Sequence, residues 1–394
     1  MRHPLLLMAV VAGLGLVLAP SGGSFADGGE AYPSKIALGE ALFHDPNLSK
    51  NRSQSCSTCH APGAGFVDAR QTDLVGSDVS LGDDGQSLGG RNAPTAGYAA
   101  LTPPFSKGSD GEYRGGFFWD GRARTLEDQA GGPPLNPVEM GMPDKAAVIS
   151  RLREDPSYDR SFRVLYGQNV FQDDETAYSA MVNALAEYER GPEFSSFDSR
   201  YDRYLGGEEK LTDQEELGRV LFFSQQFTNC SICHEVRGPN GLKDAVFTNH
   251  KYFNIGVPAN PRLAAGTAGA AKPDLGLAEN PLVAGEPTAR GKFKVPSLRN
   301  VAVTGPYMHN GVFRDLRSVV LFYVKYNSIK KSRQINPETG QEWGAPEVPD
   351  NLAMEQLTAG PALDDKRVDA IVAFLKTLTD RRYEPLLTQE KLKQ

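Results

Sequence analysis

Two copies of the motif Cys-x-x-Cys-His limit what this chain can fold into more than any other feature. They lie at 56–60 and 230–234, and they contain all four cysteines of the 394-residue sequence. In such a motif the two thiols add across the vinyl groups of a haem, and the histidine that follows becomes the proximal ligand of the iron. The sequence therefore predicts two covalently bound c-type haems, attached through Cys56 and Cys59 with ligand His60, and through Cys230 and Cys233 with ligand His234.

Zinc coordination and disulfide bonds are the other uses of a Cys-x-x-Cys pair. A zinc site needs four thiolates or imidazoles that meet at one place. The two motifs start 174 residues apart (230 minus 56), and each pair is followed by its own histidine. Two haems, one for each motif, explain this pattern better than one shared zinc ion.

The sequence of the N-terminal 26 residues predicts that the protein is exported from the cytoplasm. Arg2 and His3 precede an apolar stretch over 4–18, and Ser24-Phe25-Ala26 has the small-x-small form of a signal peptidase site. The stretch is short for a membrane span of ~20 residues, and no later segment is apolar enough to be one. We expect residues 1–26 to be a signal peptide and the mature protein to lie in the periplasm without a membrane span.

The composition bears on partners and on domain count. The formal net charge is −7, so nucleic acid, itself a polyanion, is not an expected partner. Removal of 1–26 leaves 368 residues (394 minus 26), enough for two domains at roughly 150 residues each. The similar segments 38–43 and 217–222 each precede a haem motif, which suggests a duplicated cytochrome c-like unit. We expect domains over 27–200 and 201–350, each around one haem, and a C-terminal helix and tail over 351–394 that packs back on the first domain.

Apolar periodicity predicts a mainly α fold. A capping box at 212–215 opens a helix that runs to about Phe223, and further helices are expected over 174–190, 314–326 and 364–378. In the helix over 314–326, the spacing places one apolar face along Leu316, Val319, Val320 and Tyr323. Two Gly/Pro-rich stretches, 76–116 and 256–296, are long enough to be functional loops, and we expect them to wrap the haems.

The ligand on the second face of each iron decides whether a haem carries electrons or reacts with peroxide. No histidine, methionine or cysteine occurs within 61–106, just after the first motif. The first iron is therefore expected to lack a strong sixth ligand from its own loop, and an open position is what peroxide chemistry needs. Candidate ligands elsewhere are the remaining histidines and methionines: His44, His250, His309, Met140, Met142, Met181, Met308 and Met354.

The chain resembles the bacterial di-haem cytochrome c peroxidases and, within that family, the MauG-type enzymes, which use peroxide to oxidise residues of a partner protein. The resemblance covers nearly the whole mature sequence. It rests on the two haem motifs and on other matching segments: Gly90–Thr95, Phe118–Ala123, Gln129 with Glu139, Val295–Asn300 and Gly305–Gly311.

The resemblance implies which side chains face the two irons. MauG-type members keep the first iron open beneath a proline, which Pro133 matches, whereas ordinary members carry a histidine in the loop after the first motif. Ordinary members also supply a methionine to the second iron, at the position where this chain has Tyr323. A phenolate stabilises higher iron oxidation states than a thioether does. The alternative is that Tyr323 is a core aromatic residue and that Met308, His309 or His250 is the ligand.

The same resemblance implies roles for residues between the haems. Glu139 and Gln129 match the distal pair that moves protons during cleavage of the O–O bond, although a lone glutamate in a loop is more often solvated. Trp119 matches a residue that carries electrons between the haems, although an aromatic cluster usually only packs. A calcium ion between the domains would bind the matching residues Asn92, Thr304 and Pro306, although an asparagine also suits a simple turn.

The predicted function is that of a periplasmic enzyme that uses H2O2 to reach a high-valent di-haem state, which oxidises aromatic residues of a partner protein. A detoxifying peroxidase that reduces H2O2 with electrons from a small cytochrome c or cupredoxin is one alternative. A non-catalytic di-haem electron carrier is the other. Thr228 stands where the MauG-type pattern has a tryptophan that reaches the substrate, so the electron exit route or the substrate must differ.

Overall fold

The fold is mainly helical, as the sequence predicts. The computed structural model describes residues 29–70, 78–236, 241–266, 272–283 and 285–390, so the predicted signal peptide lies outside the described residues. The α-helices are α1 (Lys35–His44), α2 (Cys56–Cys59), α3 (Leu126–Ala130), α4 (Lys145–Leu152), α5 (Pro156–Tyr166), α6 (Asp174–Glu189), α7 (Arg200–Leu205), α8 (Asp213–Phe223), α9 (Cys230–Cys233), α10 (Pro261–Gly266), α11 (Leu316–Val324), α12 (Met354–Thr358), α13 (Asp365–Lys376) and α14 (Glu384–Glu390). Strand β1 (Ser106–Lys107) pairs antiparallel with β2 (Tyr113–Arg114), and β3 (Tyr252–Phe253) pairs antiparallel with β4 (Phe293–Lys294).

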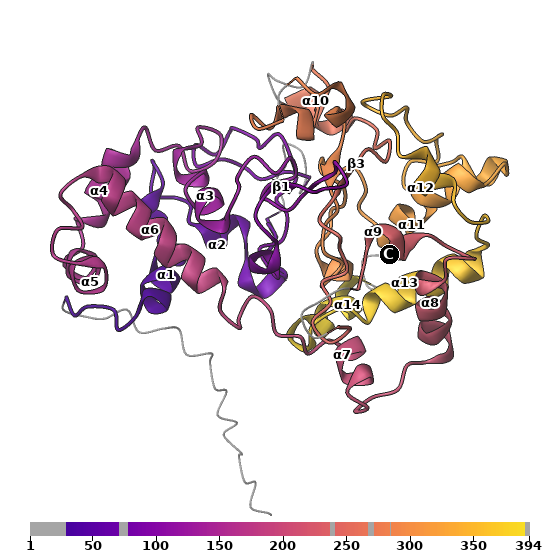
Figure 1. The fold of residues 1–394 in the computed structure, drawn as a ribbon, viewed down its shortest axis with the longest axis horizontal. Coiled ribbons are helices and arrows are strands. Elements are labelled where there is room, and N and C mark those ends of the chain that lie inside the picture. Colours follow the sequence, from indigo (N-terminus) through magenta and orange to yellow (C-terminus); the bar gives the residue numbers. More distant parts are fainter. Residues whose placement is uncertain (1–28, 71–77, 237–240, 267–271, 284, 391–394) are drawn as a thin grey trace, which may run out of the picture.

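The helices gather in two halves (Figure 1). Helices α1 to α6 lie on one side of the molecule, α8, α9 and α11 to α13 lie on the other, and β1 and β3 lie between them. The two largest apolar clusters follow the same division, because one is built from residues within 38–194 and the other from residues within 201–378. An isolated bridge between Arg114 and Lys251 connects the end of β2 to the segment that leads into β3.

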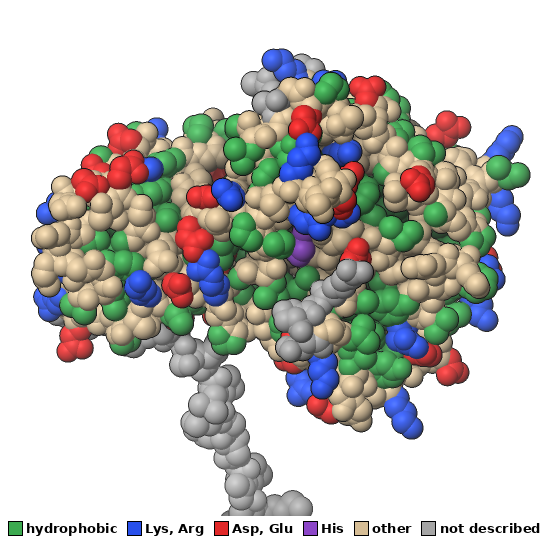
Figure 2. Space-filling view, viewed as in Figure 1, with side chains coloured by type: hydrophobic (Ala, Val, Ile, Leu, Met, Phe, Trp, Pro, Cys, Tyr) green, Lys and Arg blue, Asp and Glu red, His purple; other side chains and the backbone are tan. Residues whose placement is uncertain are grey.

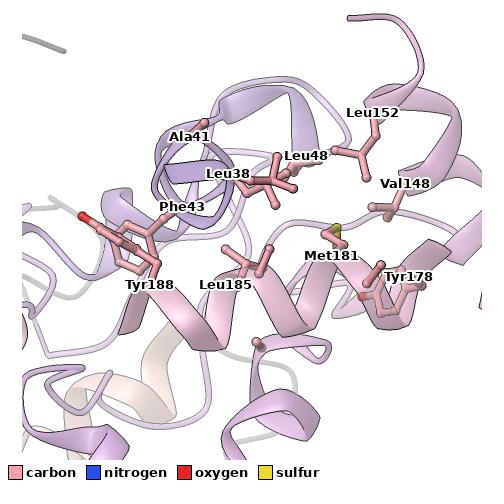
Figure 3. Close-up of a cluster of buried hydrophobic side chains, with 14 of the residues drawn as sticks. Leu38, Ala41, Phe43, Leu48, Val148, Leu152, Tyr178, Met181, Leu185 and Tyr188 are labelled. Carbon is pink, nitrogen blue, oxygen red and sulfur yellow. The ribbon is translucent and has the colours of Figure 1, made fainter. Parts of the chain in front are cut away.

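Helix α1 crosses α6 at the centre of the N-terminal half (Figure 3). The crossing is close because Gly39 has no side chain, and a Cβ there would collide with the carbonyl oxygen of Ala184. This close approach brings the apolar faces of both helices into one core, whose members include Leu38, Ala41, Phe43, Leu48, Met181, Leu185 and Tyr188. The crossing holds α1 in place directly before the first haem motif in α2.

The C-terminal half repeats this crossing. Helix α8 precedes the second haem motif in α9 and packs against α13, where a Cβ on Gly218 would collide with the carbonyl oxygen of Ala370. Gly39, at the first crossing, also lies beside the Cβ of Tyr188. Gly218, at the second crossing, lies beside the Cβ of Phe374 in the same way. The segments 38–43 and 217–222, whose likeness suggested a duplication, therefore occupy equivalent places in the two halves.

The predicted helices are present, and the apolar face predicted for α11 is buried in part. Helices α6, α8, α11 and α13 each begin and end within two residues of the predicted limits. In α11, however, Tyr323 is 36% exposed, whereas the neighbouring Leu321 and Phe322 are buried. The reason is that α11 packs against α13 and the ring of Trp343, whose centroid lies 5.6 Å from that of Phe322. These contacts turn Tyr323 away from the core.

The C-terminal region also differs from expectation in its main contact. Helix α13 packs against α8 within the C-terminal half and not on the N-terminal half. Described residues that follow α13 reach the N-terminal half. There the Tyr383 hydroxyl donates to the carbonyl of Pro62 at 2.8 Å, and the Tyr98 hydroxyl donates to Asp380 at 2.7 Å.

The two Gly/Pro-rich stretches contain little regular structure in the residues described. The first holds β1, β2 and one short turn, and the second holds α10, β4 and two short turns. Their backbone instead passes between the two halves. Both stretches supply residues to the large cavity described next.

Candidate haem and peroxide site

Each haem motif forms a single helical turn that ends at its histidine. The Nδ1 atom of His60 lies 3.2 Å from the carbonyl oxygen of Phe66, and that of His234 lies 2.9 Å from the carbonyl oxygen of Phe247. A proton on Nδ1 that is donated to this carbonyl leaves Nε2 with a free lone pair and fixes the ring orientation. Both histidines are therefore prepared to bind an iron through Nε2.

Burial holds these side chains in suitable protonation states. It lowers the pKa of His60, and it lowers the pKa of His234 to about 4, so both imidazoles are neutral near pH 7. Burial also raises the pKa of the Cys56 thiol to about 12 and that of the Cys59 thiol to about 11. The four cysteines are free thiols, and among the described residues no group of three or more His, Cys, Asp or Glu side chains could hold a metal ion. This donor set fits two c-type haems better than zinc or disulfides.

A cavity of about 1270 Å³ opens beside the first haem motif. It exceeds the roughly 300–1,000 Å³ of ordinary ligand pockets, so it has room for a haem and a small reactant together. Its walls come from both halves of the molecule, where a histidine side chain also reaches the surface (Figure 2). The predicted site residues that line it are Cys56, Cys59, His60, Asn92, Trp119, Gln129, Pro133, Glu139, Thr304 and Pro306.

Glu139 is a partly buried residue that lines this cavity. The Asn136 amide donates to its Oε1 at 2.7 Å. Burial raises the pKa of Glu139, and the positive charge of Arg122 opposes this shift in part. Glu139 in turn raises the pKa of the Cys56 and Cys59 thiols, so its carboxyl lies close to the point of haem attachment. A carboxyl in this position can accept and return a proton.

Gln129 and Pro133 reach the same cavity from the segment just before Glu139. Gln129 belongs to α3, and Pro133 begins a short 3-10 turn that ends at Leu135. Thr125 caps α3 and accepts a hydrogen bond from the backbone of Asp128 at 3.2 Å. One short stretch of chain therefore places three of the predicted residues on one wall.

Trp119 is tied to both halves of the molecule. Its Nε1 donates to the carbonyl of Asn92 at 2.8 Å, and its own carbonyl accepts a hydrogen bond from the backbone of Lys294 at 2.9 Å. The backbone of Asn92 in turn donates to the carbonyl of His309 at 2.7 Å. These bonds hold the indole at the boundary between the halves, on the cavity wall.

Three oxygen-bearing residues near Trp119 are those matched to a calcium site. The side-chain NH2 group of Asn92 donates a hydrogen bond to the carbonyl of Asp78 at 3.1 Å. The Oδ1 atom of Asn92 is then the side-chain atom that could bind a cation. Thr304 and Pro306 line the same cavity and supply carbonyl groups. Neutral oxygen donors of this kind suit Ca²⁺.

Tyr323 lies near the second haem motif. Burial raises the pKa of its hydroxyl, and the thiols of Cys233 and Cys230 add to the shift, which places the hydroxyl close to α9 although 36% of the residue is exposed. The competing candidates line the cavity beside the first motif: His250, Met308 and His309. The geometry therefore favours Tyr323 as the side chain near His234.

The two remaining cavity histidines have distinct surroundings. Burial lowers the pKa of His250 to about 4, with a contribution from the ammonium group of Lys294. The ring of His309 stacks on that of Phe293 with centroids 3.6 Å apart. Its Nε2 is buried without a hydrogen-bond partner and lies 3.8 Å from a carboxylate oxygen of Glu347. Both histidine side chains therefore form part of the cavity wall.

Sequence reasoning missed Glu189, a buried acid on the cavity wall. It is the last residue of α6, is 8% exposed and lines the same cavity as Glu139. Burial raises its pKa to about 8. The signal that could have identified it is a charge at an apolar position, because Glu189 follows Leu185 by four residues on the buried face of α6.

The described helices were also compared with the length of a membrane span. Within the described part of the chain, no helix is long and apolar enough to cross a bilayer.

Comparison with known proteins gives a consistent result. A family model described as di-haem cytochrome c peroxidase matches residues 33–210. The chain is 53% identical over 380 residues to the methylamine utilization protein MauG of Paracoccus denitrificans, covering 96% of this chain and 97% of that protein. It is 35% identical to the cytochrome c peroxidase Ccp of Escherichia coli, covering 76% of this chain and 55% of that protein. The crystal structure of the di-haem peroxidase BthA from Burkholderia thailandensis superposes with a TM-score of 0.78 at 32% identity, over 90% of this chain and 88% of that chain.

Proposed function

Because this chain belongs to the di-haem cytochrome c peroxidase family that includes MauG, and is a peroxidase-type oxidoreductase, we propose that it acts in the MauG manner. It uses H2O2 to oxidise aromatic residues of a partner protein in the periplasm. The observation that carries this proposal is the single cavity that joins His60, Glu139 and Trp119. The 53% identity to MauG over almost the full length of both proteins supports it.

The chain's own residues bind the reactants and move the protons. The four cysteines, together with His60 and His234, would hold two haems, which would supply the redox chemistry when bound. Glu139 accepts a proton from one oxygen of the peroxide and returns it to the other as the O–O bond breaks. The amide of Asn136 holds Oε1 of Glu139, so its other oxygen remains available. Gln129 orients the peroxide, and Pro133 keeps other ligands from the same wall.

Trp119 and Tyr323 have the proposed roles of electron transfer between the halves and ligation of the second iron. Trp119 provides an aromatic step between the halves, fixed by its hydrogen bond to Asn92. Tyr323 is the proposed ligand of the second iron, because its hydroxyl lies near Cys230 and Cys233. A phenolate there stabilises a higher oxidation state than a thioether would. A calcium ion bound by Asn92, Thr304 and Pro306 would hold the segments around Trp119 together.

The test uses the holoprotein with both haems attached. One equivalent of H2O2 is expected to change the optical spectra of both haems, and a co-encoded exported protein is expected to gain oxygen on an aromatic residue by mass spectrometry. Spectra that ignore both peroxide and cyanide would contradict the proposal and indicate an electron carrier.

A detoxifying peroxidase is the second candidate, favoured by the 35% identity to Ccp of Escherichia coli. The two candidates differ in turnover. Rapid, repeated consumption of H2O2 with reduced cytochrome c, without modification of any protein, would support the detoxifying role.

A further inference from the structure

Glu189 is a buried carboxyl on the peroxide cavity that the proposed function leaves without a role. No described residue donates a hydrogen bond to it, and its electrostatic environment is set by burial and by the neighbouring Arg190 alone. It lies close enough to Cys56 to raise the pKa of that thiol more than any other charged group does. A carboxyl left without partners in a protein interior costs free energy, so its presence needs a reason.

The internal repeat shows that the fold does not require an acid here. Gly39 lies beside Tyr188 in the first crossing, and Gly218 lies beside Phe374 in the second. The residue after each aromatic ring is therefore structurally equivalent: Glu189 in the N-terminal half and Leu375 in the C-terminal half. Leu375 is 6% exposed and belongs to the apolar core of its half. A leucine fills this position in one half, and a carboxyl replaces it only beside the cavity.

The chemistry of peroxide reduction has a use for a second acid. The overall change is H2O2 + 2 e⁻ + 2 H⁺ → 2 H2O, in which the O–O bond breaks and two new O–H bonds form. Glu139 moves a proton that the peroxide itself brings, so it adds none to the balance. The two protons that accompany the electrons must come from solvent through the protein.

We propose that Glu189 passes these solvent protons into the cavity as electrons arrive from the donor. This inference rests on the proposed function, whose electrons come from the partner protein, and it assigns the path of the accompanying protons. Glu189 donates its proton toward the oxygen being reduced and is then reprotonated from outside. The residue that follows Glu189 in the chain, Arg190, is exposed at the surface. There it pairs with Glu127 at 2.5 Å and with Glu187 at 3.5 Å.

The charged and titratable groups around Glu189 allow this role. On its own helix, Arg190 is the group that lowers its pKa, and burial outweighs it. On the cavity side, the carboxyls of Glu189 and Glu139 both act on Cys56, whose sulfur would be a neutral thioether once a haem is attached, and burial raises the pKa of Glu139 as well. Glu189 is therefore protonated near neutral pH, since its pKa is raised to about 8. A neutral acid carries the proton that the step requires.

The experiment separates the reaction with peroxide from the reduction that follows. Holoprotein variants E189Q, E189D and E189L are compared with wild type, and E187Q, on the exposed side of the same helix, is the control. One equivalent of H2O2 starts the first spectral change without a donor. Potassium ferrocyanide, a one-electron donor, then drives the return to the starting spectrum, so the identity of the natural partner does not matter.

For E189Q we expect the first change to proceed as in wild type and the return to slow by ~10²-fold, the lower end of what general acid catalysis contributes. The wild-type return rate is expected to fall above pH about 8, where Glu189 loses its proton, and this decline should vanish in E189Q. E189D should restore part of the rate and the pH dependence, and E187Q should behave as wild type.

Two results would overturn the role of Glu189 and leave the proposed function intact. One is a return rate and pH profile in E189Q equal to wild type. The other is an equal slowing of both phases in E189Q and E189L, which would indicate a structural role. A wild-type holoprotein that fails to react with peroxide would instead overturn the proposed function, and the inference with it.

Discussion

The N-terminal and C-terminal halves present their haem motifs in the same way. In each, a helix crosses a second helix over a glycine, at Gly39 and at Gly218, and then leads into the motif. In each, the motif histidine has its Nδ1 within hydrogen-bonding distance of a backbone carbonyl. The surroundings then diverge, since the first motif opens into a large cavity and the second lies beside Tyr323.

The polar side chains show the difference most clearly. The first half places two acids around its motif: Glu139, which is partly buried, and Glu189, which is buried. The second half has Leu375 at the position equivalent to Glu189 and a tyrosine hydroxyl near its thiols. A shared helical scaffold thus surrounds the two haem motifs with different side chains, which is the basis for proposing a different role for each site.

The largest expected effect comes from replacing Glu139, the acid proposed to exchange a proton with peroxide. E139Q keeps the shape of the side chain but cannot accept a proton, so the reaction of the holoprotein with H2O2 should slow by ~10²–10⁴-fold. Stopped-flow absorbance measures this rate. E127Q, which alters a carboxylate that pairs with Arg190 at the surface, is the control and should react as wild type. An unchanged rate in E139Q would remove Glu139 from the mechanism.

The next prediction concerns a glutamate placed at Leu375, the position in the C-terminal half that is equivalent to Glu189. L375E should lower the free energy of unfolding by ~3 kcal/mol or more, because it removes apolar packing and buries a carboxyl without a partner. L375M, which conserves volume, should cost less than ~1.5 kcal/mol. Denaturant unfolding of both holoproteins makes the comparison. Equal stability of L375E and wild type would show that the two positions are not equivalent.

A third prediction concerns the second iron. Y323F removes the hydroxyl while it preserves the ring, so the absorption spectrum of the second haem should change and the oxidised state shared by both haems should be lost. Peroxide should still react at the first haem. Y326F is the matched control, because its hydroxyl bonds to the carbonyl of Ile255 and not near the thiols. A Y323F spectrum identical to wild type would reject Tyr323 as a ligand.

The last prediction is a pH-dependent gain in stability. The folded protein raises the pKa of Glu189 from 4.5 to about 8, so between these values the native state binds more protons than the unfolded state, and stability falls as pH rises. E189L has no such loss. Its melting temperature relative to wild type should therefore increase from pH 5 to pH 9, by ~2–4 °C for each kcal/mol recovered. A constant difference across this range would contradict the assigned titration.

Local patterns predicted much of the fold. The capping box at Thr212 and the periodicity of α6 and α13 located those helices, because caps and apolar spacing act within one or two turns. The outward turn of Tyr323 could not be predicted this way. It depends on the contact of Phe322 with Trp343, which lies 21 residues further along the chain (343 minus 322). Apolar spacing within one helix contains no information about that partner.

The sequence by itself determined which residues of this protein could attach a haem covalently. The Cys-x-x-Cys-His motifs specify thiols and an imidazole at fixed spacing, and no other cysteine competes for the haems. Only the tertiary structure decided which acids face the reactant. Glu139 and Glu189 lie fifty residues apart in the chain, and both reach one cavity because α6 packs beside α3. Burial depends on atoms that distant segments supply, so the raised pKa of each carboxyl arises only in the folded chain.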